Sequence, residues 1–68
     1  MTTGQKIFYY RKRYGMTLEE LGELCGVQKS VVAKWEKDLV DMRLSRLMQL
    51  ADIFGIDPVD LLTDRKGE

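Results

Sequence analysis

The sequence predicts an all-α protein, a compact bundle of five short helices around one core. Its 68 residues fit a single domain and leave no room for a second core. No segment alternates polar and apolar residues as a strand would, and no repeat or low-complexity stretch is present. Glycines and helix-capping residues instead divide the chain into short segments whose apolar positions recur at helical spacing.

Composition narrows the class of protein further. Hydrophobic residues make up 44% of the chain and charged residues 32%, which is typical of a globular domain and not of a disordered one. No apolar run approaches the roughly 18 residues of a membrane span, and the first residues do not resemble a signal peptide. One cysteine and no histidine favour neither an internal disulfide nor a structural zinc site. We therefore expect a cytoplasmic protein that needs no metal and no cofactor.

The first helix is expected over residues 4–14. Thr2 or Thr3 can serve as its N-cap, and Gly15 lies just beyond its last turn. Its apolar face would carry Ile7, Tyr10 and Tyr14.

The second and third helices have different starting signals. Thr17 stands three residues before Glu20, which is the spacing of a capping box, and the second helix should end at Gly26. The third helix is expected over residues 28–37, where Gln28 is a poor N-cap in a place that favours serine or threonine.

Residues 18–37 together have the spacing of a helix-turn-helix. Gly22 allows a close approach of the two helices, and Gly26 can adopt the positive φ that a short turn requires. The apolar positions give each helix one buried stripe, formed by Leu21, Cys25, Val27, Val32 and Trp35.

The outer face of the third helix carries donors, one short side chain and three positive charges. Its members are Lys29, Ser30, Ala33, Lys34 and Lys37, with Gln28 at its start. Residues at this spacing lie on one side of a helix. Such a face suits the major groove of DNA, although an ordinary solvated helix surface would show the same charges.

Two more helices complete the bundle. The fourth is expected over residues 43–54, with a buried stripe formed by Leu44, Leu47, Leu50, Ala51 and Phe54, and Gly55 closes it. The fifth begins at the cap Asp57 and Pro58 and carries Val59, Leu61 and Leu62.

The charges balance overall but are unevenly distributed. Eleven lysines and arginines face eleven aspartates and glutamates, whereas a DNA-binding domain often has a basic excess. Residues 1–46 hold nine basic and six acidic groups, and residues 47–68 hold two basic and five acidic groups. A molecule polarised in this way can still be steered to phosphate.

These segments resemble the Cro and phage-repressor type of helix-turn-helix domain, the XRE family. The resemblance rests on Ile7 and Arg11, then GMTLEELGELCGV, KSVVAKWEK and LMQLADIFGIDPVDLL, and it covers residues 4–62. It implies the lambda repressor-like fold, in which the third helix enters the major groove. The stretch CGVQKSVVAKWEKDLVDMRLSRL most resembles repressors of prophages and mobile elements.

The resemblance also implies roles for single residues. Lys29 and Ser30 match positions that reach base edges, and Ala33 and Lys34 match the next turn of the same face. Thr17 matches a position near the phosphates, and Arg11 and Glu36 match an ion pair between the first and third helices. Lys34 and Lys37 could also contact phosphates, as could the 38–43 loop and Arg43, with Arg46 a weaker candidate.

Three positions depart from the family pattern. Leu18 replaces a glutamine that donates to a phosphate, Asp38 replaces a glycine after the third helix, and Met42 replaces a proline before the fourth. Asp tolerates the left-handed conformation better than most residues, so the turn at Asp38 remains compatible with the pattern.

Other candidate groups have structural interpretations. Trp35 lies on the inner stripe, so we expect it in the core and not as a stacking platform for bases. Cys25 occupies an apolar position without a basic neighbour, which predicts an inert buried thiol. Phe8 and Tyr9 stand where the family has polar residues, so they are either exposed singly or covered by a dimer contact or a second domain.

The predicted function is sequence-specific binding of double-stranded DNA as a transcriptional regulator of the repressor type. An antitoxin that represses its own operon remains open, as does a protein-interaction module of the same fold. Glu19, Glu20 and Glu23 lack a nucleophile or metal ligand beside them, so we do not expect an enzyme.

Assembly and domain limits follow from the same argument. One recognition helix reads only a few base pairs, so we expect a homodimer on a palindromic operator, with Ile56, Val59 and Leu62 as candidate contacts. The DNA-binding domain is assigned to residues 1–63. Residues 64–68 are a polar tail that would suit a linker to a further C-terminal domain or partner.

Overall fold

The computed structural model describes residues 1–62 and is all-helical over that range, as the sequence predicted. The polar tail assigned to residues 64–68, and residue 63 before it, lie outside the described part. The helices are α1 (Thr3–Arg13), α2 (Leu18–Cys25), α3 (Lys29–Glu36), α4 (Leu44–Phe54) and α5 (Val59–Leu62). Within residues 1–62 no helix combines the length and apolar character needed to cross a membrane.

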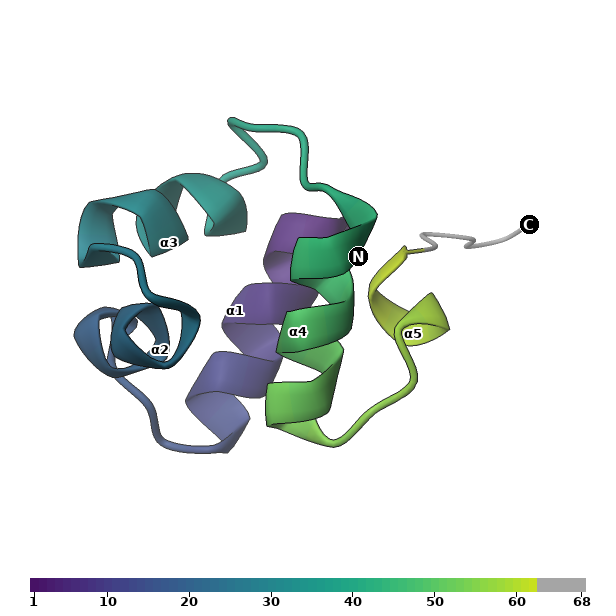
Figure 1. Ribbon diagram of the computed structural model, residues 1–68, viewed down its shortest axis with the longest axis horizontal. Helices are drawn as coiled ribbons and strands as arrows, with labels where there is room; N and C mark the ends of the chain where they lie inside the picture. Colours follow the sequence, from purple (N-terminus) through teal and green to yellow (C-terminus); the bar gives the residue numbers. More distant parts are fainter. Residues whose placement is uncertain (63–68) are drawn as a thin grey trace.

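The helices pack around α1 and α4, which lie side by side in the middle of Figure 1. The pair α2 and α3 covers one side of these two helices, and the short α5 covers the other. The loop from α3 to α4 crosses the end of the bundle nearest the start of α1. α3 therefore lies on the opposite side of the molecule from α5, with one long edge facing outward.

Local sequence signals explain most helix ends. The expected capping box of α2 is present, since the Thr17 hydroxyl accepts from the Glu20 amide at 3.0 Å and the Glu20 carboxylate accepts from the Thr17 amide at 2.8 Å. Gly26 and Gly55 end α2 and α4 with φ of 75° and 69°. Gln28 makes no side-chain capping bond, which confirms that it is a poor cap.

Several expected boundaries were one residue off. α1 begins at Thr3, so Thr2 is its N-cap, and Gln5 completes a second capping box that was not predicted from the sequence. α3 is shorter by one residue at each end, because Gln28 and Lys37 are its caps. Arg43 is the N-cap of α4 and not its first residue.

The core joins residues from all five helices. Its members are Ile7, Leu21, Cys25, Val32, Trp35, Leu47, Leu50, Ala51, Phe54 and Leu61. The Phe54 ring stacks with the rings of Tyr10 and Tyr14, and the Tyr14 hydroxyl donates to the Phe54 carbonyl at 2.7 Å. The apolar face expected for α1 thus closes the end of α4.

The prediction that Leu44 is buried was wrong. Leu44 is 57% exposed because it is the first residue of α4, one turn before Leu47 enters the core. Met42 from the preceding loop is half-buried and packs against the core.

Only one side chain of α5 enters the core. Leu61 is fully buried, and its carbonyl accepts from the Thr3 hydroxyl at 2.8 Å, so α5 is fastened to the start of α1. Val59 and Leu62 are 54% and 44% exposed, and Ile56 is half-buried. The apolar surface expected at the corner between α4 and α5 is therefore present.

Candidate nucleic-acid interface

The outward face of α3 contains the side chains predicted from the sequence. Lys29, Ser30, Lys34 and Lys37 are exposed, Ala33 is half-buried beside them, and Gln28 is exposed at the start of the face. The opposite side of α3 is anchored by Val32 and Trp35, which are 0% and 5% exposed. Because the inner side is fixed in the core, the three lysines are held on one outward edge.

The turn between α2 and α3 is tight because Gly22 has no side chain. A Cβ at Gly22 would lie 2.6 Å from the Val27 carbonyl oxygen, closer than van der Waals contact allows. The Val27 amide in turn donates to the Gly22 carbonyl at 2.9 Å. The expected close approach at Gly22 and positive φ at Gly26 are both confirmed, and they set the position of α3 against α2.

The start of α2 lies beside the start of α3. Thr17 and Lys29 line one surface hollow, together with Lys12 from the end of α1. Lys12 is exposed and adds a positive charge that was not predicted from the sequence. The run Arg11-Lys12-Arg13 was the available signal, but only the packing of α1 against α2 and α3 selects Lys12 from it.

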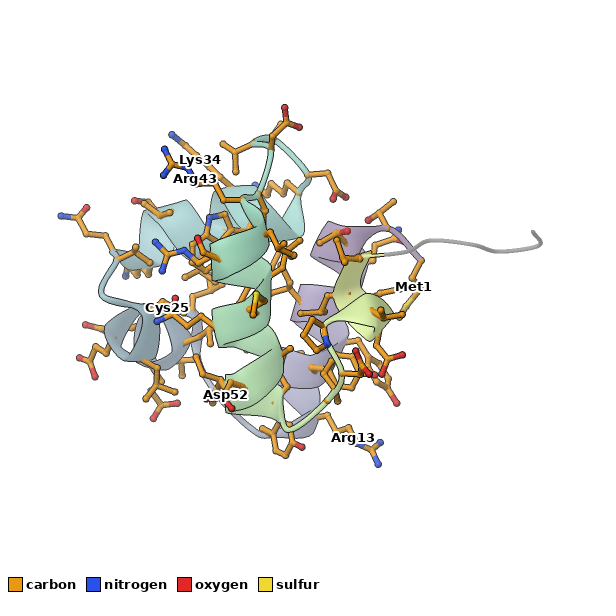
Figure 2. The ribbon with its side chains drawn as sticks, turned by 45° about the vertical axis from the view of Figure 1, so that its right-hand side comes forward. Met1, Arg13, Cys25, Lys34, Arg43 and Asp52 are labelled. Carbon is orange, nitrogen blue, oxygen red and sulfur yellow. The ribbon has the colours of Figure 1, made fainter. Side chains whose placement is uncertain are left out.

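Arg43 extends the positive surface, formed by Lys12 and the lysines of the α3 face, beyond α3. It is exposed, and it lines a hollow with Val31 and Trp35 of α3. Figure 2 shows the labelled side chains of Lys34 and Arg43 at the same end of the molecule. The structure thus brings Arg43 to the edge of α3, while Thr17 and Lys12 stand at the other flank.

Arg11 and Glu36 join α1 to α3 behind the exposed face of α3. Arg11 Nε donates to Glu36 Oε2 at 2.6 Å, Arg11 Nη2 donates to Glu36 Oε1 at 3.1 Å, and the two side chains are 9% and 10% exposed. Arg11 Nη1 also donates to the Met16 carbonyl at 2.9 Å. One guanidinium therefore holds α1, the turn before α2 and the last turn of α3 in fixed relation.

Arg46, the weaker phosphate candidate, makes contacts within the protein. Its Nη1 donates to the Cys25 carbonyl at 3.0 Å and to Gln49 Oε1 at 2.6 Å. Its guanidinium carbon also lies 5.1 Å from the centre of the Trp35 ring. Arg46 thus joins the end of α2 to α3 and α4.

Cys25 does have a basic neighbour, contrary to the expectation from the sequence. Burial raises the pKa of the Cys25 thiol above its ordinary value, and the nearby Arg46 guanidinium offsets part of that rise. A thiol with a raised pKa stays protonated near neutral pH and is a poor nucleophile. The inference of an inert core residue therefore stands for a different reason.

Phe8 of α1 lines the surface between α1 and α3. It is 48% exposed, its ring lies 5.4 Å from the guanidinium carbon of Arg11, and it lines a hollow with Leu18, Ala33 and Lys37. Leu18 is half-buried against the core. Phe8 and Leu18 therefore place apolar side chains beside Ala33 and Lys37, at two positions where the family pattern has polar residues.

Comparison with known proteins gives one family and several similar folds. A family model described as helix-turn-helix matches residues 7–61. The chain is also 33% identical over 55 residues to a protein of Methanosarcina acetivorans named as an HTH-type transcriptional regulatory protein. That match covers 76% of this chain and 17% of the relative, so the chain spans about a sixth of the relative's length.

Solved structures of similar fold include two complexes with DNA. The P22 c2 repressor bound to a synthetic operator has a TM-score of 0.86 at 23% identity, covering 96% of this chain and 98% of that one. SinR, the master regulator for biofilm formation of Bacillus subtilis, bound to DNA has a TM-score of 0.81 at 32% identity, covering 91% and 100%. The restriction-modification controller protein C.AhdI of Aeromonas hydrophila has a TM-score of 0.78 at 28% identity, covering 88% and 87%.

Proposed function

Since this chain belongs to the helix-turn-helix family of the Cro and phage-repressor type, we propose that it binds double-stranded DNA in a sequence-specific manner and regulates transcription as a repressor. The observation that carries the proposal is the exposed face of α3. Its three lysines and Ser30 point outward, while Val32 and Trp35 fix the opposite side of the helix in the core. Groove-binding helices need this combination of a rigid inner side and a polar outer side.

In this proposal α3 lies in the major groove. Lys29 and Ser30 contact base edges from its first turn, with Gln28 beside them, and Ala33 and Lys34 follow one turn later. The flanks hold the DNA backbone through Thr17 at one side and Lys37 and Arg43 at the other, and Lys12 adds a phosphate contact beside Thr17. Phosphate contacts position the protein, whereas the base contacts provide specificity.

Titration onto a duplex of random sequence tests the proposal without knowledge of the operator. A protein held by phosphate contacts binds such a duplex weakly, and its affinity falls steeply as salt increases. No binding at low salt would favour the protein-interaction module, for which the apolar flank formed by Phe8 and Leu18 is the supporting observation.

Lys29→Ala is expected to loosen sequence preference at one or two base pairs. If Lys29 donates to guanine, its loss costs about 1–3 kcal/mol at that position and little at others. The measurement is a comparison of affinities for the operator and for single-base-pair variants of it. An unchanged preference at every position would remove Lys29 from the set of base contacts.

Lys37→Ala should weaken binding to all sequences by a similar factor. One phosphate contact fewer lowers the slope of log affinity against log salt by about one. The slope is measured with a random duplex at several salt concentrations. A larger loss for the operator than for the random duplex would assign Lys37 a base contact instead.

We further propose that residues 1–63 act as the DNA-binding domain and that two copies bind one palindrome in the cytoplasm. The two α3 helices would then lie about 34–36 Å apart, one helical turn of DNA. The exposed Val59 and Leu62, with Ile56, offer apolar surface for contact between the copies. Footprinting on DNA flanking the gene tests this arrangement, and protection of one asymmetric half-site by a monomer at full affinity would contradict it.

The acidic side chains of α2 support no catalytic role in this proposal. Glu20 is bound in the capping box, and Glu19 and Glu23 are exposed. Within residues 1–62 no three His, Cys, Asp or Glu side chains are grouped so that they could hold a metal ion.

An autoregulating antitoxin would use the same DNA surface and would differ by binding a toxin. Co-expression with the neighbouring gene product would detect such a complex.

A further inference from the structure

Asp38 adopts a backbone conformation that is unusual for its residue type. It directly follows the C-cap of α3 and has a φ of 58°, the one positive φ of a non-glycine residue among residues 1–62. Its amide donates to the Trp35 carbonyl and the Leu39 amide donates to the Lys34 carbonyl, both at 3.0 Å. This pair of bonds is a Schellman motif, in which glycine is the usual residue at the left-handed position. A compensating interaction is therefore expected of the side chain.

The Asp38 carboxylate supplies that interaction at the start of α1. Its Oδ1 accepts from the Gly4 amide at 2.8 Å, and its Oδ2 accepts from the Thr2 hydroxyl at 2.5 Å. α1 has no acidic residue in its own first turn. Asp38 thus provides, from 34 residues away, the negative charge that the positive end of a helix dipole favours.

The backbones of α1 and α3 touch at the same point. A Cβ on Gly4 would lie 2.5 Å from the Trp35 carbonyl oxygen and 2.6 Å from that of Glu36. α1 therefore rests directly on the last turn of α3, and the Asp38 carboxylate fixes the contact from the side. Lys37 and the loop that leads to Arg43 lie immediately on either side of Asp38 in the chain.

We propose that Asp38 is a positioning residue for the DNA-facing surface. By capping α1, its carboxylate holds the end of α3 and the start of the 39–43 loop in one orientation, which sets where Lys37 and Arg43 meet the DNA backbone. The role of Asp38 in placing Lys37 and Arg43 on DNA rests on the proposed function. The cap itself is a property of the free protein.

Three replacements at Asp38 separate the turn from the cap. Asp38→Gly keeps the left-handed turn and loses the cap, whereas Asp38→Ala loses both. Asp38→Asn keeps the turn and the bond from the Gly4 amide, because asparagine tolerates this conformation and its amide oxygen can accept, but it loses the negative charge and the acceptor for the Thr2 hydroxyl. Asp41→Gly and Asp41→Asn are the matched controls, since Asp41 is exposed in the same loop and has the same charge.

Amide hydrogen exchange in the free protein tests the cap. Asp38→Gly and Asp38→Ala should lower the protection of the Gly4 amide by about tenfold or more relative to the core amide of Leu50. Asp38→Asn should retain most of the protection, and neither Asp41 variant should change it. If the Gly4 amide is equally protected from exchange in Asp38→Gly and in the unchanged protein, the Asp38 carboxylate does not cap α1.

Binding to a random duplex at low salt tests the positioning role. Loss of one negative charge should by itself strengthen binding to DNA, so Asp41→Gly is expected to bind slightly more tightly. Asp38→Gly should bind about threefold or more weakly despite the same change in charge, because a smaller fraction of the molecules has the binding orientation. Asp38→Asn should behave like Asp41→Asn.

The outcomes distinguish this inference from the proposed function. If Asp38→Gly binds as tightly as Asp41→Gly while the unchanged protein binds duplex, Asp38 has no positioning role. If the unchanged protein does not bind duplex, the proposed function fails, and the role of Asp38 at DNA fails with it. The hydrogen-exchange result at Gly4 still decides whether the Asp38 carboxylate caps α1. Circular dichroism and thermal unfolding verify that each variant is folded at the temperature used.

Discussion

Arg11→Ala is expected to lower the free energy of unfolding by about 3–5 kcal/mol, because it leaves the Glu36 carboxylate buried without its partner. The side chains of the pair are 9% and 10% exposed, so water cannot replace the lost contact fully. The Met16 carbonyl also loses a donor at 2.9 Å. Urea unfolding followed by circular dichroism measures the change.

Two further variants test the geometry of this pair. Arg11→Lys should recover only a small part of the loss, since an ammonium group cannot reproduce the two parallel bonds to Glu36 and the third to Met16. Arg13→Ala is the control, because Arg13 is exposed and, among residues 1–62, its side chain bonds only to the Tyr9 hydroxyl at 3.3 Å. It should change stability by about 0.5 kcal/mol or less. Equal costs for Arg11→Ala and Arg13→Ala would show that the pair contributes no more than surface charges do.

Gly4→Ala is expected to destabilise the protein by about 1–3 kcal/mol, the usual cost of forcing extra atoms into a packed site. Helix propensity alone predicts the opposite sign, since alanine in a helix is favoured over glycine by about 1 kcal/mol. The added Cβ would meet two backbone oxygens of α3 at 2.5 and 2.6 Å, and backbone cannot move aside as a flexible side chain can. Urea unfolding again gives the sign and the size.

Gly15→Ala separates crowding from backbone strain. Gly15 has a φ of 68°, but nothing lies within 4 Å of an added Cβ, so its replacement costs only the strain, about 1–2 kcal/mol. Asparagine at position 15 should recover part of that cost, whereas no side chain at position 4 relieves the clash with α3. A stabilising effect of Gly4→Ala would show that α1 and α3 are not in direct contact at Gly4.

The helices and the charged face were predictable because their signals are local. A threonine and a glutamate three residues apart, or a glycine after an apolar stripe, fix a helix end through contacts within one turn. The turn at Gly26 and the outward lysines of α3 follow from such spacing, and the structure places both as expected. The ion pair implied by family resemblance for Arg11 and Glu36 is likewise present as a direct contact.

The remaining features depend on contacts between residues far apart in the chain. Arg46 belongs to the α2–α3–α4 junction because the Cys25 carbonyl and the Trp35 ring lie beside it, which no local pattern indicates. Lys12 joins the positive surface only through the packing of three helices. Leu44 was misplaced because helical periodicity gives the direction of a side chain but not where the neighbouring helices end.

The burial of Trp35 beneath Arg46 gives the protein its own optical reporter. The chain has one tryptophan, and its indole is 5% exposed with a guanidinium over the ring. Its fluorescence therefore reports the environment at the α2–α3–α4 junction alone and shifts to longer wavelength when water reaches the ring. Because Trp35 lies on the inner side of α3, charge changes on the outer face are expected to shift the emission maximum less than changes in the core do. Variants of that face can thus be separated from variants of the core by one spectrum each.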